Sequence, residues 1–232
     1  LKKGTVPNKD VLRHEKIRAQ PRVGDRTNVR TTLMGAVCND PTLQPHLPQV
    51  ILPLYSKKAS PPSYLLEEYT NTGYPLEYWH GTTGSVTAGV MKAWLTRLRS
   101  VVQSHRPHAW LVVVVDCAKC HTEHSVFIHA RRLGIVLVYV PSRLTWLLQL
   151  LDVFVFARLK WTLRRELMRE TCARPNIRPT IHHRVQSQGT AIRKVLVETD
   201  WTDLFRNVGL HPDMSEPRAE IRDVLPVHDA VS

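Results

Sequence analysis

A run of six apolar residues ends in a carboxylate in the stretch Trp110-Leu111-Val112-Val113-Val114-Val115-Asp116. Six apolar residues without alternation indicate a strand buried on both faces, as in a parallel sheet covered by helices. The carboxylate that ends the run is costly to bury unless a cation or a partner compensates its charge. A purely structural alternative is that Asp116 caps the helix that follows.

A second acid stands in an equally unfavourable place. Asp152 lies within the apolar run from Leu144 to Ala157, which at 14 residues is short of the roughly 20 that a membrane span requires. Two carboxylates in apolar surroundings favour a divalent metal site at a sheet edge, with Asp116 and Asp152 as ligands.

The segments around these acids predict an α/β fold with one mixed sheet flanked by helices. Gly and Pro signals and the apolar periodicity place strands at residues 29–38, 50–54, 109–116 and 135–140, and helices at 85–104, 123–133 and 145–170. Two more helices are expected within residues 180–208, and residues 55–85 read as loop with a short helix near 64–69. In this arrangement Asp116 at a strand end faces Asp152 on a helix.

Three sequence motifs follow one another along the chain. They read Val115-Asp116-Cys117-Ala118-Lys119-Cys120-His121-Thr122, then Gly134-Ile135-Val136-Leu137-Val138-Tyr139-Val140-Pro141, then Leu147-Leu148-Gln149-Leu150-Leu151-Asp152-Val153. Together they resemble the DDE domain of mariner/pogo-type transposases, which reads Asp-Asn-Ala-x-x-His, then a strand from Gly to Pro, then Leu-Leu-Gln-Pro-Leu-Asp-Val. Strand-like segments near Arg30–Asp40 and Leu47–Pro53 look like the family's second and third strands, so the resemblance covers residues 26–165.

This resemblance implies an RNase H-like fold in which three acids hold two Mg²⁺ or Mn²⁺ ions for DNA strand cleavage and transfer. Asp116 would be the second acid, Asp152 the third, and His121 would lie near the metals. The first acid is not identifiable, because residues 1–25 contain only Asp10, Glu15 and Asp25, none of them in a strand-like run. Asp40 falls on a turn of the family pattern.

We therefore expect a DDE domain that lacks its first strand and is partly degenerate. Cys117, Trp146, Leu150 and Phe154 replace residues that are usual in the family. The missing ligand implies impaired cleavage, so the sequence is compatible both with an active DDE endonuclease and with an inactive derivative. The alternative is a domesticated, non-catalytic protein that binds DNA or chromatin.

Charge points to a nucleic-acid partner. The chain of 232 residues has a formal net charge of +12 and an isoelectric point near 9.9, which favours DNA over an acidic small molecule. Ten Lys or Arg and two Glu give residues 158–194 a local charge of +8. Arg158, Lys160, Arg164 and Arg165 are the candidate phosphate contacts, and a solvated helix face is the alternative. A homodimer is also compatible with the sequence.

The cysteines exclude a disulfide framework, since the four of them (38, 117, 120 and 172) are irregularly spaced. Reduced thiols, and the absence of a signal peptide or membrane span from the sequence, indicate cytosolic synthesis and a nuclear location. Cys117, Cys120, His121 and His124 offer a less favoured alternative, a zinc-stabilised binding module. Trp94, Trp110, Trp146 and Trp161 lie in apolar-periodic segments and are expected in the core.

Four segments are expected along the chain. Residues 1–25 form a basic arm, 26–172 the DDE domain, 173–208 a helical extension that is basic at its start, and 209–232 an acidic, flexible tail.

Overall fold

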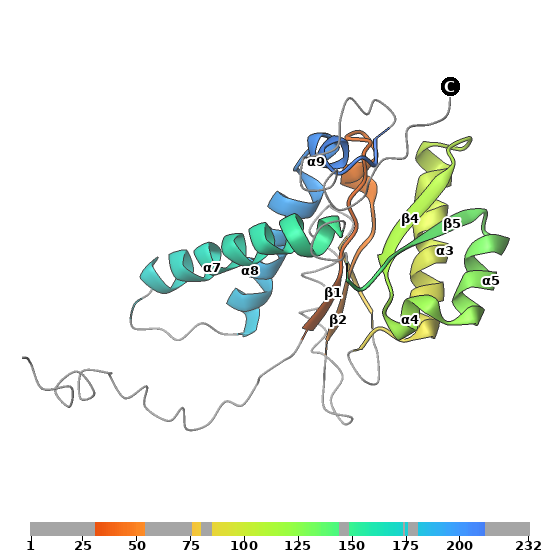
Figure 1. The fold of residues 1–232 in the computed structure, drawn as a ribbon. Coiled ribbons are helices and arrows are strands. Elements are labelled where there is room, and N and C mark those ends of the chain that lie inside the picture. Colours follow the sequence, from red (N-terminus) through yellow and green to blue (C-terminus); the bar gives the residue numbers. More distant parts are fainter. Residues whose placement is uncertain are drawn as a thin grey trace, which may run out of the picture.

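The computed structural model describes residues 31–53, 76–79, 85–143, 149–173, 175 and 181–211. Within these ranges the chain is a mixed α/β protein (Figure 1). The strands are β1 (Thr31–Met34), β2 (Gln49–Pro53), β3 (Leu76–Tyr78), β4 (Leu111–Asp116) and β5 (Ile135–Val140). The helices are α3 (Ala88–His105), α4 (Lys119–Thr122), α5 (His124–Arg132), α7 (Phe156–Ala173), α8 (Ile181–Ile192) and α9 (Thr202–Asn207), with a 3₁₀ turn η1 (Gln44–His46) and π-helical turns η2 (Leu151–Val155) and η3 (Arg193–Val197).

The strands form two sheets. In the first, β1 pairs antiparallel with β2, and β2 pairs parallel with β3. In the second, β4 and β5 pair in parallel, from Leu111 opposite Ile135 to Asp116 opposite Val140. The single mixed sheet expected from the sequence is therefore wrong for the described residues, because a cavity separates β4 from the segment that continues β1.

Helix α3 supplies the core that both sheets share. It begins after Thr87, whose hydroxyl accepts the N–H of Val90 as an N-cap. Apolar residues at helical spacing place Met91, Trp94, Leu95, Leu98 and Val102 on one buried face. They pack against residues of both sheets and of the segment after β1, which are Met34, Ala36, Val50, Leu52, Val113 and Ile135. Burial of each large apolar side chain stabilises the fold by about 1.5–3 kcal/mol.

The β4–β5 sheet has one covered face and one open face. Gly134 joins α5 to β5 with φ of +67°, a conformation that glycine adopts without strain. Val113 and Ile135 are buried on the α3 side, whereas Val112, Val136 and Val138 are 54%, 46% and 42% exposed. The prediction that this strand is buried on both faces is therefore wrong, because no helix of the described chain covers its second face.

The C-terminal helices cover β1, β2 and β3 (Figure 1). Ile51 and Leu76 pack against Val155 at the end of η2 and against residues of α8, η3 and the segment before α9, which are Ile192, Val195, Leu196 and Trp201. On α7 the buried Glu166 side chain binds the Nζ atom of Lys194 at 2.9 Å and Nη1 of Arg169 at 3.2 Å. This ion cluster fixes α7 against η3.

Most elements lie where the sequence predicts them, with differences at their ends. Strand 135–140 is confirmed residue for residue, helix 85–104 is Ala88–His105, and the region 180–208 holds α8 and α9. The sequence did not predict β3, because a strand of three residues is too short to show the alternation of apolar and polar side chains. The helix expected near 64–69 lies outside the described residues.

The tryptophans divide between core and surface. Trp94 is buried as expected, but Trp110 and Trp161 are 89% and 59% exposed, so their prediction as core residues is wrong. Trp146 lies outside the described residues. No described helix combines the length and the apolar character needed to cross a membrane.

Candidate functional site

Asp116 ends β4, where its half-buried carboxylate is held by the turn that follows. Its Oδ1 atom accepts the backbone N–H of Ala118 at 3.0 Å and lies 2.6 Å from Nδ1 of His121. The hydrogen bond from the residue two positions ahead makes an Asx turn that leads into α4. The helix-capping alternative is close to what is observed, although the N-cap residue itself is Ala118.

His121 is positioned from two sides. The short helix α4 carries it back toward the end of β4, and the hydroxyl of Tyr139 on β5 donates to its backbone carbonyl at 3.2 Å. Its side chain is 20% exposed, and that of Asp116 is 30% exposed. This pair therefore lies at the carboxyl edge of the parallel strands, where open α/β sheets commonly bind ligands.

Asp152 lies in the π-helical turn η2, directly before α7. The turn is closed by the N–H of Phe156, which donates to the carbonyl of Leu151 five residues back. Single π-helical turns are frequent at functional sites. The Asp152 side chain is exposed, and it lines the same cavity as Asp116 and His121.

Gln149 is a polar residue of this region that the sequence interpretation did not assign. It lines the same cavity, and its Oε1 atom is buried with no hydrogen-bond partner among the described residues. A polar residue inside the apolar run from Leu144 to Ala157 was the available signal.

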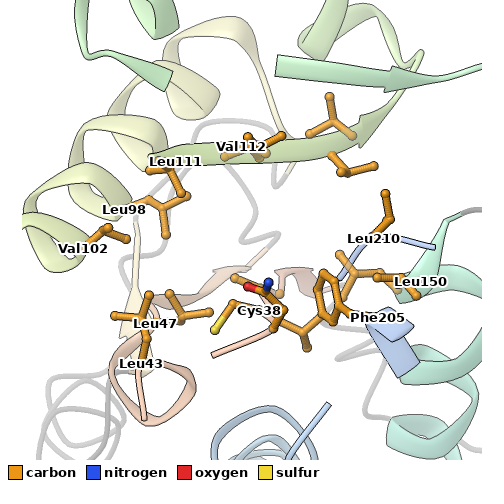
Figure 2. Close-up of a pocket in the computed structure, with 18 of the residues that line it drawn as sticks. Cys38, Leu43, Leu47, Leu98, Val102, Leu111, Val112, Leu150, Phe205 and Leu210 are labelled. Atoms are coloured by element: carbon orange, nitrogen blue, oxygen red, sulfur yellow. The ribbon is translucent and has the colours of Figure 1, made fainter. Parts of the chain in front are cut away.

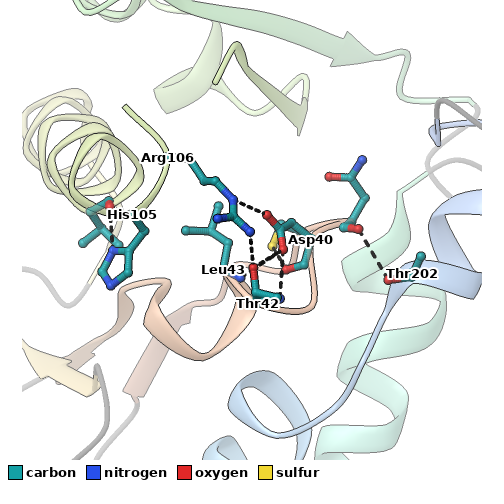
Figure 3. A network of polar contacts seen from close by, with 9 residues as sticks. Asp40, Thr42, Leu43, His105, Arg106 and Thr202 are labelled. Carbon is teal, nitrogen blue, oxygen red and sulfur yellow. Dashed lines mark hydrogen bonds and ion pairs between the residues drawn. The ribbon is translucent and has the colours of Figure 1, made fainter. Parts of the chain in front are cut away.

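Asp40 has a structural role, as its turn position indicates. Its carboxylate accepts the N–H and hydroxyl of Thr42 at 2.9 and 2.6 Å and binds Nε of Arg106 at 2.9 Å (Figure 3). Burial alone would raise the pKa of Asp40, but the bonds from Thr42, Arg106 and Leu43 outweigh it and lower the pKa to about 2. These partners hold the Asp40 carboxylate in the turn beside Thr42 and Arg106.

The described residues fit a divalent metal only in part. Asp116 and Asp152 supply carboxylate oxygens, which suit Mg²⁺ and Mn²⁺. No group of three or more His, Cys, Asp or Glu side chains arranged to hold a metal occurs among the described residues. The same finding argues against the zinc alternative there. The four cysteines are free thiols, and the Sγ of Cys117 donates to the carbonyl of Val140.

Comparison with known families supplies the identity of the domain. The profile of the family described as DDE superfamily endonuclease matches residues 28–198. The chain belongs to this family. A DDE endonuclease acts on DNA, and its superfamily generally depends on divalent metals, so the partner and cofactor class predicted from the sequence agree with this match. Comparisons with curated proteins and with solved structures gave no match.

The DDE domain presents its candidate DNA contacts on α7. Arg158, Lys160, Arg164 and Arg165 are all exposed on this helix. The guanidinium of Arg165 stacks over the ring of Trp161 at 4.6 Å, whereas that of Arg158 lies 5.6 Å from the ring of Trp201. Arg158 therefore also has an intramolecular contact. Trp161 is therefore part of an exposed basic helix face, although sequence periodicity alone assigned it to the core.

Proposed function

We propose that this chain is a DNA-binding domain derived from a mariner/pogo-type DDE transposase, of RNase H-like fold, whose cleavage chemistry is impaired. The observation that carries the proposal is the position of α7. This helix begins with Phe156 at the cavity lined by Asp116 and Asp152, and it continues as an exposed basic surface. A DNA backbone bound along α7 would therefore run toward the two acids.

The ancestral chemistry would use Mg²⁺ or Mn²⁺ held by Asp116 and Asp152. Such ions activate the attacking oxygen and stabilise the leaving oxygen when a full set of ligands holds them. Here two acids supply part of that set, and Asp116 is also bonded to His121. Weak metal binding and impaired cleavage follow. Action on chromosomal DNA would place the protein in the nucleus.

Salt dependence of duplex DNA binding tests the proposal. Each phosphate contact lowers the slope of log K against log salt by about one, so Arg164→Ala with Arg165→Ala should reduce the slope by about two. A matched control is Arg131→Ala with Arg132→Ala, an exposed arginine pair on α5. Fluorescence anisotropy with random-sequence duplexes between low and high salt gives both slopes. Two results would refute the assignment of α7: an equal reduction of the salt slope in both double variants, or binding that does not change with salt.

A further inference from the structure

Helix α7 presents an exposed apolar side chain among arginines. Met168 lies in the C-terminal half of the helix and is 69% exposed. Arg164 and Arg165 lie one turn before it on the same side, Arg169 follows it, and all three are exposed. These four side chains are called the Met168 face below. Trp161 lies outside this face, about 10 Å from Met168 along the helix axis.

The positive charge of the Met168 face is only partly neutralised. Arg169 binds the Glu166 carboxylate at 3.2 Å, and Arg165 lies 4.0 Å from it. Lys194 binds the same carboxylate at 2.9 Å, so three cations share one buried acid. No ion pair engages Arg164 within the described part of the chain. A second copy of this face would add further positive charge, whereas an acidic segment with apolar side chains would complement it.

The chain contains a segment of this kind after α9. Residues 212–232 lie outside the described ranges, and their sequence has five acids and two arginines. Within it, residues 215–225 read Ser-Glu-Pro-Arg-Ala-Glu-Ile-Arg-Asp-Val-Leu, and Pro226 follows. A serine and a proline at the start and a proline after the end are the signals that bound a helix. The sequence therefore predicts that residues 215–225, called the acidic segment below, can form a helix when they are bound.

On a helix, the acidic segment would present carboxylates and apolar side chains next to each other. Three acids recur at intervals of four and three residues and form one row, which consists of Glu216, Glu220 and Asp223. The row beside it is apolar and consists of Ile221, Val224 and Leu225. Arg218 and Arg222 lie on the side opposite the acids. One side of the segment thus matches the Met168 face in both charge and apolar character.

The connection between α9 and the acidic segment is long enough to reach this face. Phe205 of α9 belongs to one cluster with Leu150 and Phe154, which lie just before α7. Leu210 lines the same end of the cavity as Leu150 and Phe205 (Figure 2). Ten residues of helix separate Phe154 from Arg164, about 15 Å, whereas the eight residues 209–216 can span about 26 Å.

We propose that the acidic segment docks on the Met168 face of its own chain and competes with DNA for it. The competition rests on the proposed function of α7, whereas the docking does not. A tethered segment acts at an effective concentration of about 1 mM, so a contact with a Kd of about 0.5 mM covers the face for about two thirds of the time. Docking would then lower the apparent affinity for DNA about threefold.

Oxidation of Met168 by hydrogen peroxide measures the docking without DNA. Peroxide transfers one oxygen atom to the thioether and leaves water, so the rate depends on access to the sulfur. In the full chain, Glu220→Gln with Asp223→Asn should raise this rate about threefold, because the face is no longer covered. The matched control is Asp213→Asn with Asp229→Asn, which removes two acids outside the segment and should leave the rate unchanged. Peptide mass spectrometry measures Met168 separately from the other methionines.

Duplex DNA binding measures the competition. In fluorescence anisotropy at low salt, Glu220→Gln with Asp223→Asn should bind a random-sequence duplex about threefold more tightly than the control double variant does. The two variants have the same net charge, so a general change in attraction to DNA affects both equally.

The outcomes separate the docking from the function of α7. Equal rates of Met168 oxidation in the parent chain and in both double variants would overturn the proposal. A parent rate that falls as the protein concentration rises would assign the cover to a second copy and would also overturn it. If the rates differ as expected but both variants bind DNA equally well, the docking is upheld and the assignment of α7 as the DNA surface fails.

Discussion

The Nδ1 atom of His121 lies 2.6 Å from Oδ1 of Asp116, so the carboxylate at the end of β4 is bonded within the protein itself. The same oxygen accepts the N–H of Ala118. The residue that family resemblance assigns to a metal therefore also shapes the turn into α4. A divalent ion at Asp116 would have to share the carboxylate with these partners or displace them.

The structural role of Asp116 can be measured without metal. In EDTA, Asp116→Ala should lower the free energy of unfolding by about 1–2 kcal/mol, because two hydrogen bonds to a partly exposed carboxylate are lost. Asp116→Asn keeps an acceptor oxygen for the Ala118 amide and should cost less. Urea denaturation followed by circular dichroism gives both values. Equal stability of Asp116→Ala and the parent chain would show that the turn does not depend on this carboxylate.

Impaired cleavage is a second prediction. With Asp116 and Asp152 as the remaining acids, Mn²⁺-dependent nicking of supercoiled plasmid should be undetectable, because an incomplete ligand set disturbs both ions of a two-metal site. Asp116→Ala and Asp152→Ala serve as comparison variants. Nicking by the parent chain that both substitutions abolish would mean that a further ligand completes the site, and the impairment would be disproved.

The sequence predicted the elements of the fold better than their assembly. The apolar run that ends at Asp116 and the strand that follows Gly134 determine two strands through local pattern alone. Burial of the second face of β4 depends on which distant segments cover it, and no local pattern encodes that. The exposed valines at 112, 136 and 138 are the result.

The site shows the same division. The motifs placed Asp116, His121 and Asp152 in one region, because their spacing reflects the order of elements along the chain. In the structure all three residues line one cavity. The motifs did not reveal the hydrogen bond between His121 and Asp116, which depends on how α4 turns back toward β4. Trp161 was assigned to the core because helical periodicity counts apolar residues and does not show which face the rest of the protein covers.

Gln49 provides a third prediction, about the wall of the cavity. Gln49→Leu keeps the side-chain size but leaves the N–H of Ala36 without its partner, whereas the carbonyl of Ala36 still accepts from Nε2 of Gln44 at 3.2 Å. One buried N–H without a partner should cost about 1–3 kcal/mol in the free energy of unfolding. Hydrogen exchange at Ala36 should accelerate as well. Gln149→Leu, which removes a buried amide oxygen that has no described partner, is the control and should be close to neutral or stabilising.

The pH dependence of stability follows from Glu166. The hydrogen bond from Lys194 and the charges of Lys194, Arg169 and Arg165 lower its pKa below the ordinary value of 4.5 despite burial. A carboxyl group whose pKa is lowered by folding contributes stability that is present above its unfolded pKa and is lost as the pH falls. Glu166→Gln should therefore be less stable than the parent chain at pH 7, by about 2 kcal/mol.

This difference should shrink as the pH falls below 4.5 through the lowered pKa of Glu166. Urea denaturation of both chains between pH 7 and pH 3 tests it. A difference that is constant over this range would mean that the ion cluster adds nothing through its charge.

Trp161 leads to the last prediction, which concerns single-stranded DNA. Its ring is exposed beside Arg164 and Arg165, and the guanidinium of Arg165 already stacks on it at 4.6 Å. Bases in single strands are free to stack on such a ring, and each stacked base contributes about 1–3 kcal/mol. Trp161→Ala should therefore weaken binding of an oligothymidine by about fivefold or more and leave duplex binding, which depends on phosphate contacts, nearly unchanged. Trp161→Phe should retain most of the affinity. Trp110→Ala is the control, because Trp110 is exposed but directly precedes β4 and does not belong to α7. Equal weakening by Trp161→Ala and Trp110→Ala would show that α7 is not a stacking surface.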